Sequence, residues 1–183
     1  MPGVSLNEQG RGQAQELAQR LAGAGIATIY SSPQQRTRET VAPLAGRLAK
    51  AVVTANEFDE IDFGHWTGRR FIELEREDAQ RWRGWVEQRS EAQPPGGETF
   101  TQVAHRVMAG LQRLRAHHRD QTVLVLSHGD VIKAALASCL QMSLDHLEQF
   151  DIDPASMSIV AATGESWKVR AINQSLTGPA LPP

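Results

Sequence analysis

Apolar and polar residues recur along the chain at helical and at strand spacing in turn. Apolar positions at helical spacing follow Asn7, which can cap a first helix, and Gly23 and Gly25 mark its end. A short apolar run from Ile26 to Tyr30 predicts a strand, and Ala51 to Ala55 is a second strand candidate. Strands that alternate with helices across short turns favour a mainly parallel sheet covered on both faces.

A helix is predicted between these two strands, and it has its own start signal. Ser32 can act as its N-cap, and Pro33 can take the first helical position, where the missing N–H of proline costs nothing. Pro43 lies farther along this helix, and we expect a kink there because proline removes a helical hydrogen bond.

The pattern changes in the middle of the chain. Residues Glu57 to Gly68 read EFDEIDFGHWTG, a mixture of acids, aromatics and glycine that is typical of a structured loop. A polar helix is predicted from Phe71 to Gln88, and Pro and Gly residues then break the chain. We interpret residues 69–97 as a helical insertion that could cover a site below it. Its tryptophans, Trp82 and Trp85, are expected to be packing residues rather than ligand contacts.

The second half contains the clearest strand and helix pair. Thr99 and Gln102 form a capping box ahead of an amphipathic helix. The stretch Thr122 to Leu136, TVLVLSHGDVIKAAL, then reads as a buried strand, a sharp loop and a helix. Two later strand candidates, Met157 to Ala162 and Trp167 to Ile172, predict a hairpin at the edge of the sheet.

These elements predict an α/β protein with three layers, α/β/α, around a mainly parallel sheet. A chain of 183 residues with 40% hydrophobic residues suits one domain, which we expect to cover residues 1–175, followed by a flexible tail over residues 176–183. The hydrophobic pattern therefore fixes an expected architecture before any chemistry is considered.

Charge and cysteine content narrow the possible partners and the compartment. The 19 basic and 21 acidic residues give a net charge of −2, so the chain offers no general field for nucleic acid or anionic membrane. A single cysteine, Cys139, excludes an internal disulfide and suits a reducing compartment. No apolar run reaches membrane-spanning length, and Met1 to Gly3 lack the features of a signal peptide. We therefore expect a soluble, cytoplasmic protein.

Three polar residues fall at places where α/β proteins build sites. His128 ends the later strand, and Gly129 beside it allows close approach of the backbone to a ligand. Arg36 lies in the first turn of a predicted helix, where an anion is favoured, and Glu60 lies in the acidic loop. An arginine, an imidazole and a carboxyl group together suit phosphoryl chemistry. Taken singly, each could equally be a surface ion-pair residue, a solvated acid or a histidine that closes a strand.

The chain resembles the histidine phosphatase superfamily, also called phosphoglycerate mutase-like. The resemblance rests on five motifs in the family's order: SLNEQGRGQAQELAQRL, IYSSPQQRTRETVAPLA, FDEIDFGHWTG, PPGGETFTQV and TVLVLSHGDVIKAAL. It implies catalysis through a phosphohistidine, without a metal or other cofactor, on a small phosphorylated metabolite. It also implies roles for Arg36 and Gly129 in phosphate binding, for Glu60 as general acid or base, and for His128 as the second histidine of the pocket. Arg38 could be mistaken for Arg36, but the motif spacing favours Arg36.

The chain also departs from that family. Members open with a strand that ends in Arg-His-Gly and carries the nucleophilic histidine, whereas this sequence begins after that point. His65, His105, His117 and His118 are not at predicted strand ends, so we expect no nucleophile in this chain. The expected explanation is an N-terminally shortened version of a normal enzyme. The alternative is that the sheet closes up, or that a partner strand fills the gap.

Three functions remain open. We favour a phosphomonoester phosphatase, inactive as written because the nucleophile is missing, over a phosphoglycerate mutase, because the predicted insertion is short for an elaborate lid. A phosphate-binding pseudoenzyme is the third reading. The sequence does not set the oligomeric state, and a homo-oligomer is compatible with it.

Overall fold

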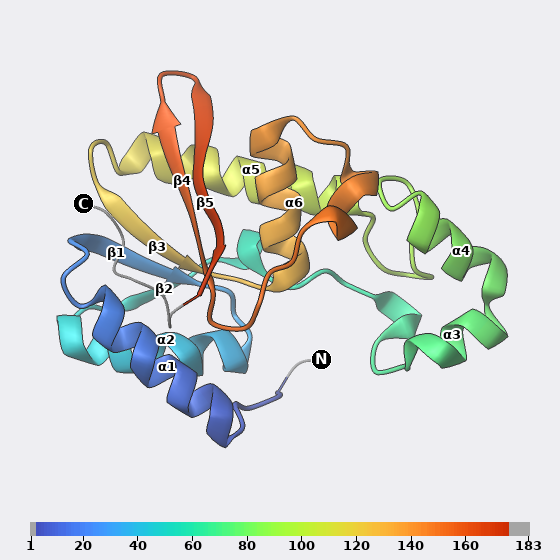
Figure 1. The fold of residues 1–183 in the computed structure, drawn as a ribbon, viewed down its shortest axis with the longest axis horizontal. Coiled ribbons are helices and arrows are strands. Elements are labelled where there is room, and N and C mark those ends of the chain that lie inside the picture. Colours follow the sequence, from blue (N-terminus) through green and yellow to red (C-terminus); the bar gives the residue numbers. More distant parts are fainter. Residues whose placement is uncertain (1–2, 176–183) are drawn as a thin grey trace.

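A parallel sheet of three strands forms the centre of the structure. The computed structural model describes residues 3–175, and Figure 1 shows their fold. Strand β1 (Ile26–Ser31) lies between β2 (Val52–Thr54) and β3 (Thr122–Leu126). Tyr30 on β1 is opposite Val53 on β2 and Val125 on β3. All three strands run in the same direction, so their carboxyl ends meet at one edge, where ligands of such sheets collect.

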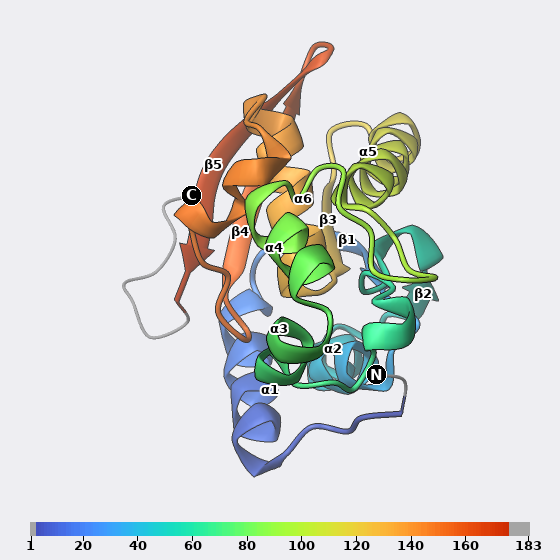
Figure 2. The same cartoon turned by 90° about the vertical axis from the view of Figure 1, so that its right-hand side faces the viewer.

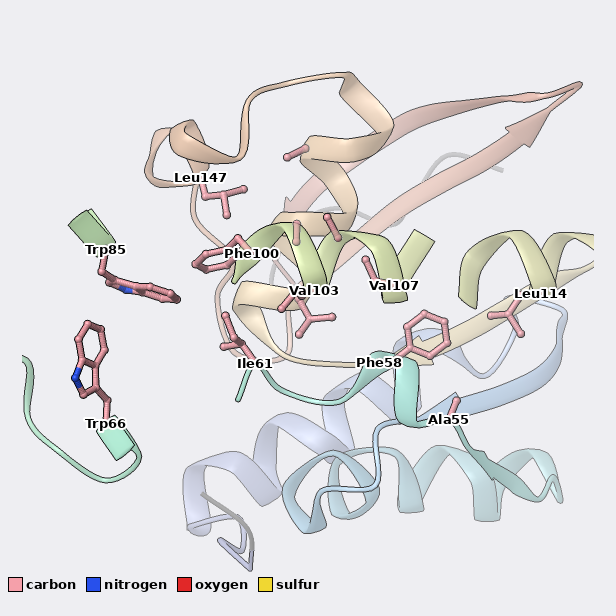
Figure 3. Close-up of a cluster of buried hydrophobic side chains, with 14 of the residues drawn as sticks. Ala55, Phe58, Ile61, Trp66, Trp85, Phe100, Val103, Val107, Leu114 and Leu147 are labelled. Carbon is pink, nitrogen blue, oxygen red and sulfur yellow. The ribbon is translucent and has the colours of Figure 1, made fainter. Parts of the chain in front are cut away.

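Helices cover both faces of this sheet, as the alternating pattern predicted. Helices α1 (Glu8–Leu21) and α2 (Gln35–Leu48) lie on one face, and α5 (Phe100–His117) and α6 (Gly129–Leu140) lie on the other (Figure 1). Each face has its own apolar cluster. The α1 and α2 side is built on Leu17, Ile29, Val41 and Leu44. The α5 and α6 side includes Phe58, Phe100, Val103 and Val131, part of which Figure 3 draws.

The predicted helix caps are confirmed in two places and wrong in one. Asn7 accepts a hydrogen bond from the N–H of Gly10, and Thr99 and Gln102 form the reciprocal capping box. Helix α2, however, begins at Gln35, so neither Ser32 nor Pro33 occupies the predicted position. The hydroxyl of Ser32 has another polar partner in the site described below, and this partner could not be seen from the local sequence.

The middle of the chain forms two short helices where one was predicted. Helices α3 (Phe71–Glu77) and α4 (Ala79–Glu87) meet at Asp78, whose backbone is not helical (φ −136°, ψ 47°). Aspartate favours such breaks because its side chain competes with the backbone for hydrogen bonds. Trp85 is buried in the apolar cluster, and Trp82 packs against Trp66, as expected of packing residues. These helices project to one side of the sheet (Figures 1 and 2).

The predicted hairpin is present, but it forms a sheet of its own. A short 3-10 segment, η3 (Leu144–Gln149), leads to β4 (Met157–Thr163) and β5 (Ser166–Gln174), which pair antiparallel. The hairpin hydrogen-bonds to neither edge of the parallel sheet. Within residues 3–175, β3 pairs with β1 on one side and with no strand on the other. All five residues of β3 are at least partly exposed, unlike an interior strand of a parallel sheet.

Two sequence-based expectations about the periphery have different outcomes. Residues 176–183, predicted to be a flexible tail, lie outside the described part of the chain. Among the helices of residues 3–175, none combines the length and apolar character needed to cross a bilayer.

Candidate active site

The candidate site lies at the carboxyl edge of the parallel sheet, where β1 and β3 end side by side. The N–H of Ser32 donates to the carbonyl of Leu126 at 2.9 Å, so the chain segments after the two strands leave the sheet together. The segment after β1 leads into α2, and Arg36 is the second residue of that helix. The segment after β3 reaches His128, the N-cap of α6. Arg36 and His128, which are 92 residues apart in sequence, are thereby brought into contact by parallel strand pairing.

The structure brings the three predicted side chains together around His128. Arg36 Nη2 lies 3.0 Å from His128 Nδ1, and Glu60 Oε2 lies 3.4 Å from the same nitrogen. Arg36 Nη2 also pairs with Glu60 Oε2 at 3.3 Å. Each of the three is therefore in contact with the other two, and the possibility of an isolated surface ion pair is excluded for Arg36.

The partners of His128 fix its protonation. A guanidinium only donates, so Nδ1 accepts from Arg36 and the proton is on Nε2. That Nε2 lies 2.8 Å from the hydroxyl of Ser32, which in turn donates to Asp59 Oδ1 at 3.0 Å. Burial, together with the charge of Arg36, lowers the pKa of His128 to about 4. At neutral pH the site therefore holds a neutral imidazole.

Glu60 is poised between its two protonation states near neutral pH. Burial and, to a smaller extent, the negative charge of Asp130 raise its pKa to about 7, although the Ile61 N–H and Arg36 oppose the shift. A carboxyl group with such a pKa can give up a proton and take it back at the pH of the cell. This is the property that a general acid and base requires.

Gly129 is the first residue of α6, immediately after His128. Its N–H is one of the first four of the helix, which have no partner within the helix and lie at the positive end of its dipole. The predicted role in phosphate binding through this backbone group is compatible with that position.

The sequence did not single out two residues that shape this site. Asp59 ends the hydrogen-bond chain from His128 and also accepts from the N–H of Glu60 at 2.8 Å. Arg106, in the middle of α5, donates to the carbonyls of Glu57, Asp59 and Glu60. Asp59 could have been found from its place in the acidic motif, but nothing local distinguishes Arg106 from any polar residue of an amphipathic helix.

The other histidines have different surroundings. His118 Nε2 lies 2.8 Å from the hydroxyl of Tyr30, and its Nδ1 lies 2.9 Å from Gln121 Oε1. Within residues 3–175, no hydrogen bond or ion pair joins His128 to another histidine. The same described residues contain no group of three or more His, Cys, Asp or Glu side chains placed to hold a metal ion.

Comparisons with known proteins identify relatives of the chain. The chain is 39% identical over 173 residues to the bifunctional protein Rv2228c of Mycobacterium tuberculosis, an alignment that covers 93% of this chain and 47% of that protein. This chain thus spans about half the length of the relative. It is 34% identical over 155 residues to phosphoserine phosphatase 1 of Hydrogenobacter thermophilus, covering 85% of this chain and 74% of the relative.

A solved structure extends the likeness to the fold. YhfR from Bacillus stearothermophilus superimposes with a TM-score of 0.89 over 96% of this chain and 89% of its own, at 27% identity. The homologues include enzymes named for phosphatase activity. Residues 1–175 match the histidine phosphatase superfamily, branch 1, and the chain belongs to that superfamily.

Proposed function

We propose that this chain forms the phosphate-binding and acid–base part of a phosphomonoester phosphatase. The observation that carries the proposal is the mutual contact of Arg36, Glu60 and His128, at 3.0 to 3.4 Å, at the carboxyl edge of the sheet. A fixed guanidinium holds two phosphoryl oxygens at once. The single N–H of the neutral His128 imidazole would donate to a phosphoryl oxygen in exchange for the Ser32 hydroxyl, and the Gly129 N–H adds a backbone donor.

Glu60 supplies the proton that hydrolysis needs. When a nucleophilic imidazole attacks phosphorus, the bond to the leaving oxygen breaks and protonated Glu60 gives its proton to that oxygen. Water then attacks the phosphohistidine, the Glu60 carboxylate takes the proton of the water, and inorganic phosphate leaves. The pKa of about 7 lets the same carboxyl act in both steps.

The nucleophile is the part that these residues do not supply. The sequence contains no Arg-His-Gly. Within residues 3–175 one edge of β3 pairs with no strand, and a strand that carries this motif could pair there. An added strand parallel to β3 on that edge would end next to His128, because β3 itself ends two residues before it. The unpaired N–H and C=O groups of an exposed strand edge are a template for pairing with a further strand, which favours occupation of this edge. We infer that turnover requires such a strand.

The first test uses this chain as it is. Titration with vanadate, a phosphate analogue, measures binding, and release of inorganic phosphate from p-nitrophenyl phosphate measures turnover. We expect vanadate to bind, binding to fall at least tenfold in Arg36→Ala, and Arg38→Ala to bind normally, because Arg38 is exposed two residues farther along the same helix. Failure to bind vanadate would overturn the site.

The second test separates a missing nucleophile from a non-catalytic binding protein. Robust turnover by this chain would refute the requirement for an added strand. With an Arg-His-Gly strand fused ahead of residue 1, we expect turnover to appear and to fall by orders of magnitude in His128→Ala and in Arg36→Ala. Vanadate binding with no turnover in the fused chain would instead support a phosphate-binding pseudoenzyme.

A further inference from the structure

Asp130 is a half-buried carboxyl group that the proposed reaction does not use. It is the second residue of α6 and lies two positions after His128, the N-cap of that helix. Within residues 3–175 its carboxylate makes no hydrogen bond and no ion pair. Withdrawing a charged group from water without a partner costs free energy, so a function at this position is indicated.

The surroundings of Asp130 favour its negative form. It lies in the first turn of α6, where the helix dipole stabilises an anion. Burial raises the pKa of Asp130, and the negative charge of Glu148 adds to that shift. The positive charges of Arg89 and Lys133 oppose it. No comparable pair of cations and no helix N-terminus compensates burial at Glu60, so Asp130 is the better placed of the two carboxyl groups to carry a charge.

The contacts of Glu60, in contrast, favour a protonated carboxyl group. Glu60 Oε2 lies 3.4 Å from His128 Nδ1, and Arg36 Nη2 lies 3.3 Å from the first atom and 3.0 Å from the second. Two acceptors that face each other at this distance repel each other unless a proton lies between them. The one proton of the neutral imidazole is on Nε2, so the proton between these two atoms belongs to Glu60.

The charged groups around Glu60 act on this proton in different ways. Asp59 Oδ1 accepts from the N–H of Glu60, and Arg106 of α5 donates to its carbonyl, so neither binds its carboxyl group. Arg36 of α2 favours the carboxylate form. Burial is the largest cause of the raised pKa of Glu60, and Asp130 of α6 is the charge that adds to it.

Two neighbouring carboxyl groups in unlike surroundings separate into a proton donor and a charged partner. Here the desolvated group in contact with His128 is the donor, and the group at the start of α6 is the charged partner. The negative charge of this partner opposes the loss of the proton from the donor, because ionisation would place two like charges close together.

We propose that Asp130 is a positioning residue that keeps the transferable proton on Glu60, so that the acid form needed by the leaving oxygen is present at neutral pH. The proposal rests on the acid–base role of Glu60 proposed above, and Asp130 acts through Glu60 without touching the substrate. When the bond from phosphorus to the leaving oxygen breaks, that oxygen takes the proton of Glu60. The charge of Asp130 then makes the Glu60 carboxylate a stronger base towards the water that attacks the phosphohistidine.

A pH titration of the full chain, followed by carbon-13 NMR of the Glu60 carboxyl carbon, tests the proposal directly. The signal is assigned by its loss in Glu60→Gln. We expect Asp130→Asn to lower the midpoint by about one pH unit, because it removes a like charge. Asp130→Ser, a second neutral residue, should give the same shift, and Asp130→Glu should restore the parent midpoint. An unchanged midpoint in the neutral variants would overturn the role of Asp130.

Glu16→Gln is the matched control. It also removes one negative charge, but from the exposed side of α1, which covers the opposite face of the sheet. Its Glu60 midpoint should equal that of the parent chain. An equal shift in this variant would show that net charge alone sets the midpoint, and would refute a specific role for Asp130.

Turnover in the chain with the fused Arg-His-Gly strand separates this role from a structural one. With phenyl phosphate, whose leaving oxygen needs a proton, Asp130→Asn should move the alkaline limb of the kcat profile to lower pH and change KM less than twofold. An equal loss of kcat at every pH would indicate a structural role and overturn the proposal. If vanadate fails to bind the parent chain, the phosphate pocket is refuted; if vanadate binds and the Glu60 midpoint stays unchanged in Asp130→Asn, only the role of Asp130 is.

Discussion

Two neighbouring regions of this chain use charged residues in opposite ways. The first, which we call the acid loop, is residues 55–68, and it carries Glu60. The acid loop is held from inside the protein: Arg106 donates to three of its carbonyls, and its guanidinium also pairs with Glu98 at 2.8 and 2.9 Å. The side chain of Arg106 is 22% exposed.

The second region is residues 69–87 of the helical insertion, which contain α3 and α4, and its ion pairs are at the surface. Arg69 pairs with Glu77, and Arg70 with Glu73, where the side chain of Arg70 is 79% exposed. The hydrogen bond from Arg70 lowers the pKa of Glu73, and the hydrogen bond from Arg69 lowers that of Glu77, whereas burial raises the pKa of Glu60. Buried Trp85 of α4 packs against Phe100 of α5, so these residues are attached to the protein through an apolar contact rather than through their ion pairs.

The comparison shows that the number of ion pairs does not indicate where the structure is fixed. Residues 69–87 have more of them, but each is solvated and contributes little. The acid loop is held by one half-buried arginine of α5, which donates to several of its backbone carbonyls at once. Holding the Glu60 carboxyl group away from water costs free energy. The hydrogen bonds from Arg106 fix the acid loop and so keep that carboxyl group in place where the chemistry is proposed.

The largest expected effect contrasts the arginine of α5 that holds the acid loop with an arginine of the insertion. Arg106→Ala leaves the Glu98 carboxylate and three loop carbonyls without their donor, and we expect it to lower the free energy of unfolding by about 3–5 kcal/mol. Arg70→Ala should leave stability unchanged within error. Urea unfolding of both variants measures the difference, and equal effects would contradict the comparison.

The second expected effect concerns pH. A carboxyl group whose pKa is higher in the folded than in the unfolded protein loses stabilisation as the pH rises through the folded value. For Glu60 the window runs from about 4.5 to about 7. We expect the stability of Glu60→Gln relative to the parent chain to rise by about 3 kcal/mol across that window. Glu73→Gln, measured in the same series of urea titrations, should show no such rise.

The smallest expected effect uses the same substitution at a glycine that packs against the acid loop and at a glycine within the insertion. A Cβ on Gly110 of α5 would lie 2.4 Å from Glu57 Cγ and 3.0 Å from Phe58 Cζ, whereas at Gly84 of α4 nothing lies within 4 Å. Gly110→Ala should therefore destabilise the protein by about 1–3 kcal/mol through overpacking. Gly84→Ala should stabilise it by about 0.5–1 kcal/mol through helix propensity. Thermal unfolding would show midpoint shifts of opposite sign.

Local sequence patterns predicted the elements well and their long-range contacts poorly. The caps at Asn7 and Thr99, the strands and the hairpin were predictable because each depends on residues a few positions apart. The break at Asp78 was missed because the apolar spacing continues across it.

The candidate site shows the same limit. The proximity of Arg36 and His128 followed from parallel strands whose ends meet at one edge, and the contact is confirmed. The hydrogen bond from His128 to Ser32 joins residues that are 96 positions apart. The hydrogen bonds from Arg106 to the carbonyls of Glu57 and Glu60 join residues that are 49 and 46 positions apart. Such pairs leave no periodic trace, so they required coordinates. The catalytic roles of these residues stay predictions.

The one-sided pairing of β3 has a consequence for the exchange of amide hydrogens with solvent. Successive N–H groups of a strand point alternately to its two sides, so within residues 3–175 only every second amide of β3 is bonded to β1. Deuterium uptake along Thr122–Leu126 should alternate between slow and fast positions, while the central strand β1 is slow at both. A ligand strand that occupies the free edge would abolish this alternation, and its binding could be followed residue by residue.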